Sequence, residues 1–234
     1  MGNNLMVLNN VTKSFDNKTV LDNISMDIAL SEITFLIGPN GAGKTSLLSL
    51  LTGISEKESG EILFEDSVIN IPYSNKIKKK ITLVPDQPMY FDYLTVKENI
   101  KYFSQIYNRT ISENKVQSLI KKYKLENETN KLVKFFSRGM KQKVNLSIIE
   151  IVNSDFIILD EPTLGLDISS IIFLKETLLN LKKEGKTILI TSHNTKFCED
   201  LADNIYLIFN KNIKRLDYIN GCSLEQLFIT EIGG

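Results

Sequence analysis

The sequence predicts an α/β fold: a mainly parallel β-sheet with helices, an antiparallel β-region at the N-terminus and a helical insertion in the middle. Three observations predict it. Continuous apolar runs are typical of buried parallel strands, and helix-forming segments alternate with them. Residues 95–152 are mostly helical in pattern, with many lysines and asparagines and no strong strand. At 234 residues, the chain can bury a substantial core as one domain.

The elements follow in order along the chain. LMVLNNVTKSF and VLDNISMDIA alternate apolar and polar residues, which predicts short strands of an antiparallel edge sheet. ITFLIG (33–38) is a buried strand ending in glycine, KTSLLSLLTGI is a leucine-rich helix, and SGEILFED is a strand after a Ser-Gly turn. Beyond the helical insertion we expect three strands, with a helix over 168–184 between the first two: FIILDEP (156–162), KTILITSH (186–193) and NIYLIFN (204–210).

The charge balance argues against a nucleic-acid partner. Lysine plus arginine and aspartate plus glutamate both number 28, so no net field attracts a polyanion. Arginine, the usual residue for reading bases, occurs only at Arg109, Arg138 and Arg215. No apolar run approaches the roughly 20 residues that span a bilayer. We therefore expect a cytoplasmic protein, unless a partner carries it to a membrane.

The strongest motif is GPNGAGKT, which lies between a buried strand and a helix. Its glycines let the backbone wrap around phosphate, and the helix N-terminus adds positive potential. Lys44 would reach the β- and γ-phosphates and the Thr45 hydroxyl would bind Mg²⁺. A chance match arises in on the order of one per cent of chains this long. We predict nucleotide-binding residues at Gly38, Pro39, Asn40, Gly41, Ala42, Gly43, Lys44, Thr45 and Ser46.

A second motif, FIILDEP, ends a buried strand with two carboxylates. We expect Asp160 to lie beside the strand that precedes the phosphate-binding loop and to hold Mg²⁺, directly or through water. Glu161 at the carboxyl edge of the sheet can polarise the water that attacks the γ-phosphate. Alone, Asp-Glu-Pro is better explained as a polar turn, but together with the phosphate-binding loop it favours catalysis.

The order and spacing of GPNGAGKT, SRGMKQ, ILDEPTLGLD and TSH resemble those of ATP-binding cassette (ABC) ATPases, over essentially the whole chain. The resemblance implies a RecA-like P-loop NTPase core with an N-terminal antiparallel β-subdomain and an inserted helical subdomain. It also implies one ABC ATPase domain over residues 1–234, with the core at about 1–90 and 153–234 and the helical subdomain at about 91–152.

The stretch FFSRGMKQKV is a second candidate anion site. In the family it matches the signature, usually LSGGQ, which binds the γ-phosphate of ATP held by a second subunit in a head-to-tail dimer around two ATP. Ser137 would supply a hydroxyl and Gly139 a backbone N–H, while Arg138 and Met140 depart from the pattern. Asp167 matches the loop that crosses the dimer interface. Considered alone, the stretch would be an ordinary helix cap.

Other family positions carry over singly. Phe15 matches the aromatic that stacks on adenine, and Val20 would line the same pocket; the alternative for Phe15 is ordinary strand packing. His193 matches the switch histidine that contacts the γ-phosphate and Glu161. Either Asp86 or Gln87 would be the residue that reaches Mg²⁺ or the attacking water.

The resemblance further implies an ATP-hydrolysing subunit that powers a separate transmembrane permease. It would work as a homodimer or with a related ABC subunit, peripheral on the inner face of the cell membrane. The SRGMKQ form looks most like two-component exporters of drugs or antimicrobial peptides. Tyr90, Phe91 and Tyr93 would contact the permease, or belong to the subdomain core. The alternatives are a soluble ABC ATPase that assembles cofactors, or a nucleotide-binding regulator.

Overall fold

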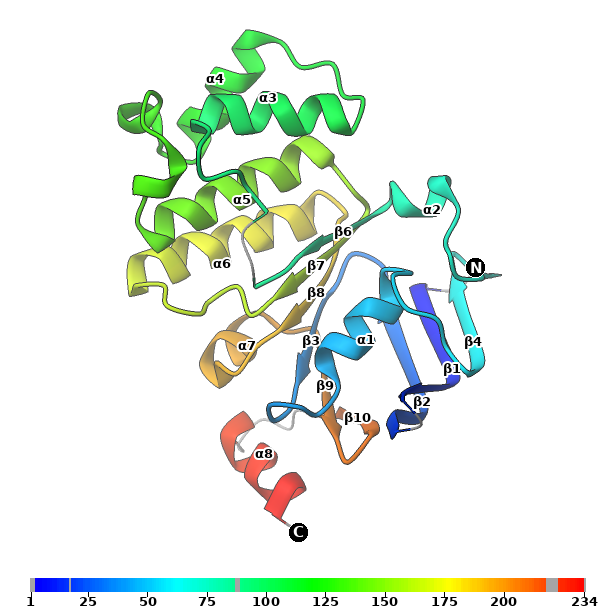
Figure 1. The fold of residues 1–234 in the computed structure, drawn as a ribbon. Coiled ribbons are helices and arrows are strands. Elements are labelled where there is room, and N and C mark those ends of the chain that lie inside the picture. Colours follow the sequence, from blue (N-terminus) through cyan, green and yellow to red (C-terminus); the bar gives the residue numbers. More distant parts are fainter. Residues whose placement is uncertain (1–2, 17, 87–88, 218–222, 234) are drawn as a thin grey trace.

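The computed structural model describes residues 3–16, 18–86, 89–217 and 223–233. Within them, the chain forms an antiparallel sheet, a mainly parallel sheet and a group of helices that lies apart from the antiparallel sheet (Figure 1). No helix in the described part is both long and apolar enough to cross a membrane. The α/β class is confirmed.

The antiparallel sheet has the strand order β2-β1-β4-β5. Its strands are β1 (Asn4–Phe15), β2 (Lys18–Ala29), β4 (Ser59–Phe64) and β5 (Ser67–Val68). The antiparallel prediction is confirmed, but β1 and β2 are 12 residues long rather than short. They extend because alternate apolar side chains, such as Leu8 and Ile24, continue one buried face that packs on α1 (Lys44–Leu51).

The parallel sheet has the order β10-β9-β3-β8-β7-β6, and β10 pairs antiparallel with β9. Its strands are β3 (Ile33–Ile37), β6 (Ile81–Val84), β7 (Phe156–Asp160), β8 (Thr187–Thr191), β9 (Asn204–Phe209) and β10 (Asn212–Leu216). The expectation that Asp160 lies beside the strand preceding the phosphate-binding loop is wrong. The crossover through α6 (Ile168–Lys183) returns the chain to form β8, which pairs with both β3 and β7 and separates them.

Helices cover both faces of the parallel sheet, so its central strands are buried on two sides (Figure 1). In β3, Phe35 and Ile37 belong to one apolar core, whereas Leu36 belongs to the other, which includes the leucines of α1. The remaining helices outside the insertion are α2 (Asn75–Lys78), α7 (Thr195–Leu201) and α8 (Leu224–Gly233).

The insertion between β6 and β7 is helical, as predicted. It contains α3 (Val96–Ile106), α4 (Glu113–Lys122) and α5 (Arg138–Val152), with short 3₁₀ turns at Glu126–Glu128 and Val133–Phe135. Each of the three α-helices begins with a side-chain cap, from Thr95, Ser112 and Ser137 respectively. The division of the chain into core and helical subdomain at the expected boundaries stays a prediction.

Buried Asn99 of α3 fixes the segment that joins β6 to the helices. Its Oδ1 accepts a hydrogen bond from the Phe91 backbone N–H at 2.7 Å. Its Nδ2 donates to the carbonyl oxygens of Phe91 at 3.1 Å and Thr95 at 3.0 Å. A single side chain thus bonds backbone groups at both ends of the segment 91–95 and adds to the backbone hydrogen bonds that this segment makes.

We predict that Asn99→Ala lowers the free energy of unfolding by about 2 kcal/mol, because it removes three hydrogen bonds of a buried side chain and leaves the Phe91 backbone N–H without that partner. Urea denaturation measures this change. Asn180→Ala on the exposed side of α6 is the control, since it removes no hydrogen bond of comparable burial. An Asn99→Ala loss no greater than that of the control would contradict the assignment.

Candidate functional site

The phosphate-binding loop joins β3 to α1 and depends on glycine at two positions. A Cβ at Gly38 would lie 2.3 Å from the Ile208 carbonyl oxygen, so the loop passes directly against β9. Gly43 has φ +108°, a left-handed conformation that other residues rarely adopt, immediately before α1 begins at Lys44. The first backbone N–H groups of α1 therefore face the loop's interior, where an anion would be favoured.

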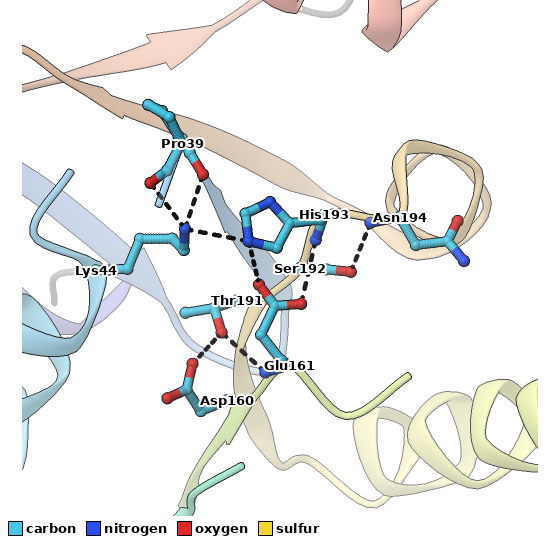
Figure 2. A network of polar contacts seen from close by, with 9 residues as sticks. Pro39, Lys44, Asp160, Glu161, Thr191, Ser192, His193 and Asn194 are labelled. Atoms are coloured by element: carbon cyan, nitrogen blue, oxygen red, sulfur yellow. Dashed lines mark hydrogen bonds and ion pairs between the residues drawn. The ribbon is translucent and has the colours of Figure 1, made fainter. Parts of the chain in front are cut away.

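The Lys44 side chain folds back over this loop (Figure 2). Its Nζ donates to the carbonyl oxygens of Gly38 at 2.7 Å and Pro39 at 3.1 Å. Burial lowers the pKa of the Lys44 ammonium, while the nearby carboxylates of Glu161 and Asp160 act in the opposite direction. The Lys44 ammonium thus lies in a partly desolvated site, close to two carboxylates.

Thr191, at the end of β8, positions both carboxylate residues at the end of β7. Its hydroxyl donates to Asp160 Oδ1 and accepts from the Glu161 backbone N–H at 3.0 Å. Glu161 has φ +46°, a conformation that costs free energy in a non-glycine residue and often accompanies function. The turn at Glu161 ends the strand and leaves the two carboxylates with different hydrogen-bond partners.

His193 contacts the Glu161 carboxylate twice (Figure 2). Its Nε2 lies 3.0 Å from Oε1, and its backbone N–H donates to Oε2 at 3.3 Å. The same Nε2 lies 3.5 Å from Lys44 Nζ. A protonated Nε2 can donate to Glu161, whereas a bare Nε2 can only accept from Lys44. The tautomer of the ring therefore decides whether Nε2 bonds to the glutamate or to the lysine.

These groups surround a pocket of about 280 Å³. Thr45, Asp86 and Asp160 present oxygen atoms to it, the ligand type that Mg²⁺ prefers. The donor set therefore fits that ion. Its lining comprises Val20, Asn40, Gly41, Gly43, Lys44, Thr45, Ser46, Asp86, Asp160, Glu161 and His193.

Some predicted site residues lie elsewhere. Phe15, at the end of β1, is 46% exposed, has Lys13 Nζ 4.4 Å from its ring centre, and is not part of the pocket lining. Gln87 lies outside the described residues, so the choice between it and Asp86 stays open. Gly38, Pro39 and Ala42 belong to the loop without lining the pocket.

The signature residues stand at the start of α5, away from this pocket. Ser137 is the N-cap, and its Oγ accepts from the Met140 N–H at 3.3 Å. Gly139 lies against α6, since a Cβ there would be 2.0 Å from Ser170 Oγ. In the described part of the chain, neither Ser137 nor Gly139 lines the pocket that contains Lys44.

Asp167 ends the loop that follows β7 and caps α6. Its Oδ1 accepts from the Ser170 N–H at 2.7 Å and from Ser169 Oγ at 2.9 Å. These hydrogen bonds hold the pKa of the exposed Asp167 carboxyl below its usual value. Asp167 is therefore a fixed anionic cap at the surface.

The aromatic residues after β6 divide between core and surface. Tyr90 is half-buried against the core, while Phe91 is 46% and Tyr93 75% exposed. Phe91 packs edge to face on Tyr102, with ring centres 4.7 Å apart. Lys134 Nζ lies 4.7 Å from the Tyr93 ring centre and 4.9 Å from that of exposed Phe135. We call Phe91, Tyr93, Tyr102 and Phe135 the aromatic surface.

Comparisons with known proteins agree with this geometry. The family model described as "ABC transporter" matches residues 21–164. The lantibiotic transport ATP-binding protein SrtF of Streptococcus pyogenes is 36% identical over 97% of both chains. The SkfA peptide export ATP-binding protein SkfE of Bacillus subtilis is 35% identical over 87% of this chain and 85% of its own.

A solved structure described as the ATP binding subunit of an ABC transporter has a TM-score of 0.81 and 25% identity, and covers 97% of this chain and 98% of its own. Its likeness extends over both sheets and the helical insertion, so the RecA-like core is confirmed. The chain belongs to the ABC transporter family, as an ATP-binding and ATP-hydrolysing member.

Proposed function

We propose that this chain hydrolyses Mg²⁺-ATP as a head-to-tail dimer, with a second copy or a related ABC subunit, and powers a separate membrane permease that exports a peptide or drug. The observation that carries the proposal is the separation of two anion-binding elements. Lys44, Glu161 and His193 surround one pocket, while Ser137 and Gly139 lie outside it. Because the signature residues lie outside the pocket of their own subunit, they can bind the phosphate held in the pocket of a second subunit.

In this mechanism Lys44 leaves the carbonyl oxygens of Gly38 and Pro39 for the phosphate oxygens. The α1 N-terminus holds the phosphates with backbone N–H groups. Thr45 and Asp160, with Asp86 or Gln87, would hold Mg²⁺, which neutralises charge on the phosphates when bound. The residues at β3, β7 and α1 thus position the nucleotide without making covalent bonds to it.

Glu161 orients and polarises the attacking water, and His193 fixes the glutamate. Ser137 and Gly139 of the second subunit would bind the same γ-phosphate, and Asp167 would lie at the interface. ATP binding would close the dimer, because only the bound phosphate bridges the two surfaces. Hydrolysis would remove that bridge and reopen it.

The substrate class and direction rest on similarity. The relatives named above are described as acting in lantibiotic transport and peptide export, so we propose a small peptide of that kind as cargo. The chain would lie on the inner face of the cell membrane through its permease. The aromatic surface is the proposed contact, since exposed large apolar patches mark protein interfaces.

We predict that Asp160→Asn lowers kcat for ATP at least about a hundredfold. The amide keeps the shape but loses the charge that binds Mg²⁺, whose electrostatic stabilisation is worth several kcal/mol at about 1.4 kcal/mol per factor of ten. Steady-state hydrolysis over a Mg²⁺ titration measures the change. Asp155→Asn, on an exposed carboxylate before β7, is the control. Equal magnesium dependence in the two variants would contradict the metal assignment.

We predict that Glu161→Gln traps an ATP-bound dimer, because nucleotide binding persists while hydrolysis falls by about 10²–10⁴. Gel filtration with Mg²⁺-ATP measures the dimer. Adding Lys44→Ala to this variant should abolish it, since the lysine is needed to hold the phosphates. A Glu161→Gln protein that stays monomeric with ATP, even with its membrane partner present, would overturn the sandwich model.

We predict that an affinity pull-down from gently solubilised membranes of the native host recovers a polytopic membrane protein at comparable abundance. Phe91→Ala/Tyr93→Ala should reduce its recovery at least about tenfold, because it removes two exposed aromatic anchors. Ile54→Ala, an exposed apolar residue outside the aromatic surface, should retain it. Recovery of soluble partners alone would favour an ABC ATPase of cofactor assembly or regulation.

A further inference from the structure

The first turn of α5 contacts the segment 165–170 at two points. A Cβ built on Gly165 would lie 2.6 Å from Arg138 Nη1, 2.9 Å from its Cδ and 3.0 Å from its Cζ. The arginine side chain therefore lies directly on the Gly165 backbone. One residue further along α5, a Cβ built on Gly139 would lie 2.0 Å from Ser170 Oγ, and the Ser170 N–H is bonded to Asp167. Two adjacent residues of α5 thus contact the chain just before and just after Asp167.

Beneath this contact lies a small pocket of about 50 Å³ that reaches the catalytic region. Arg138, Gln142 and Asn145 face it from α5 with spacings of four and three, and Asp86, Glu161 and Leu164 face them. Buried Asn145 Oδ1 and Gln142 Nε2 have no hydrogen-bond partner within the described residues. In the described part, no side-chain hydrogen bond joins this face of α5 to residues 161–167. The contact of Arg138 with Gly165 therefore helps to fix the position of that loop.

Arg138 also lies within electrostatic range of the segment after β6. Burial raises the pKa of Tyr90 and Asp92 adds to the effect, whereas the Arg138 guanidinium opposes it. The arginine therefore lies between that segment and the loop after β7, next to the pocket that contains Asp86 and Glu161. A glycine at position 138, as in the usual signature, would leave Gly165 uncovered.

We propose that Arg138 is a positioning residue that holds the loop 161–167 of its own subunit, and with it Glu161, when the α5 N-terminus engages phosphate. The step of the ATP cycle at which Arg138 acts rests on the proposed function. The contact itself belongs to one chain and exists without a dimer. Arg138 does not touch the reacting atoms; it acts through the backbone at Gly165.

The test is a double-mutant cycle with Arg138→Ala and Gly165→Ala, read by kcat, KM and the midpoint of thermal unfolding. We expect Arg138→Ala to lower kcat about tenfold with KM unchanged, since a small displacement of a catalytic group affects the chemical step. Gly165→Ala strains a φ of +67° in either background, but displaces a side chain only when Arg138 is present. Its cost in kcat should therefore be at least about threefold smaller in the Arg138→Ala background.

Arg138→Met tests whether packing rather than charge is needed, and should retain most of kcat because its unbranched stem still covers Gly165. Lys131→Ala, which removes an exposed cation of the same helical region, is the control. Additive effects of Arg138→Ala and Gly165→Ala on both kcat and unfolding would overturn the proposal. So would Arg138→Ala abolishing the ATP-bound dimer in the Glu161→Gln background, because the arginine would then act on the partner's nucleotide.

Failure of Glu161→Gln alone to dimerise would instead count against the proposed function. The unfolding cycle, measured on the nucleotide-free monomer, would still report whether Arg138 and Gly165 are coupled. Strong coupling in unfolding with no effect of Arg138→Ala on kcat would also overturn the positioning role, since the contact would then serve stability alone.

Discussion

The parallel pairing of β8 with both β3 and β7 is the constraint on which the site depends. Its register sets Thr191 opposite Leu36 on one side and Asp160 on the other, so all three strands end at the same edge. Since side chains alternate along a strand, a slip of one residue would turn the Thr191 hydroxyl away from Asp160 and the Glu161 N–H. The phosphate-binding loop, both carboxylates and His193 therefore converge because of backbone pairing, and the side-chain contacts refine a position already set.

Much of this arrangement could be predicted from sequence, because strand ends and glycine-rich turns are local signals. The apolar runs of β3, β7, β8 and β9 are recognisable, and residues that follow the first three of these strands meet at the pocket. The order of strands within the sheet was not, because pairing between distant segments leaves no local pattern; Asp160 was therefore placed beside the wrong strand. The four-residue β6 also escaped notice, since a short apolar run between a lysine cluster and a proline gives little periodicity.

The residues that sequence reasoning missed act through neighbours. Thr191 shows only as the second threonine of the strand TILIT, and its two hydrogen bonds depend on the register with β7. Arg138 was visible as a departure from the family pattern, but its contact with Gly165 depends on how α5 lies against α6. Phe15 is exposed at the end of β1 with a lysine over its ring, and adenine stacking by this residue stays a prediction.

The aromatic surface is joined to α5 by backbone contacts. The Val133 N–H donates to the Leu94 carbonyl at 3.0 Å and the Lys134 N–H to the Asp92 carbonyl at 2.9 Å, three residues or so before the Ser137 cap. Lys141, one turn into α5, pairs with Asp92 at 3.2 Å. These contacts connect the segment that contains Tyr93 to the start of α5, where Arg138 lies on the loop bearing Glu161. Contiguous packing does not by itself establish coupling, which requires one element with two arrangements whose balance both ends change. In the proposed cycle that element is the first turn of α5, because a phosphate, a membrane partner and the hydrolytic loop would all act on its residues.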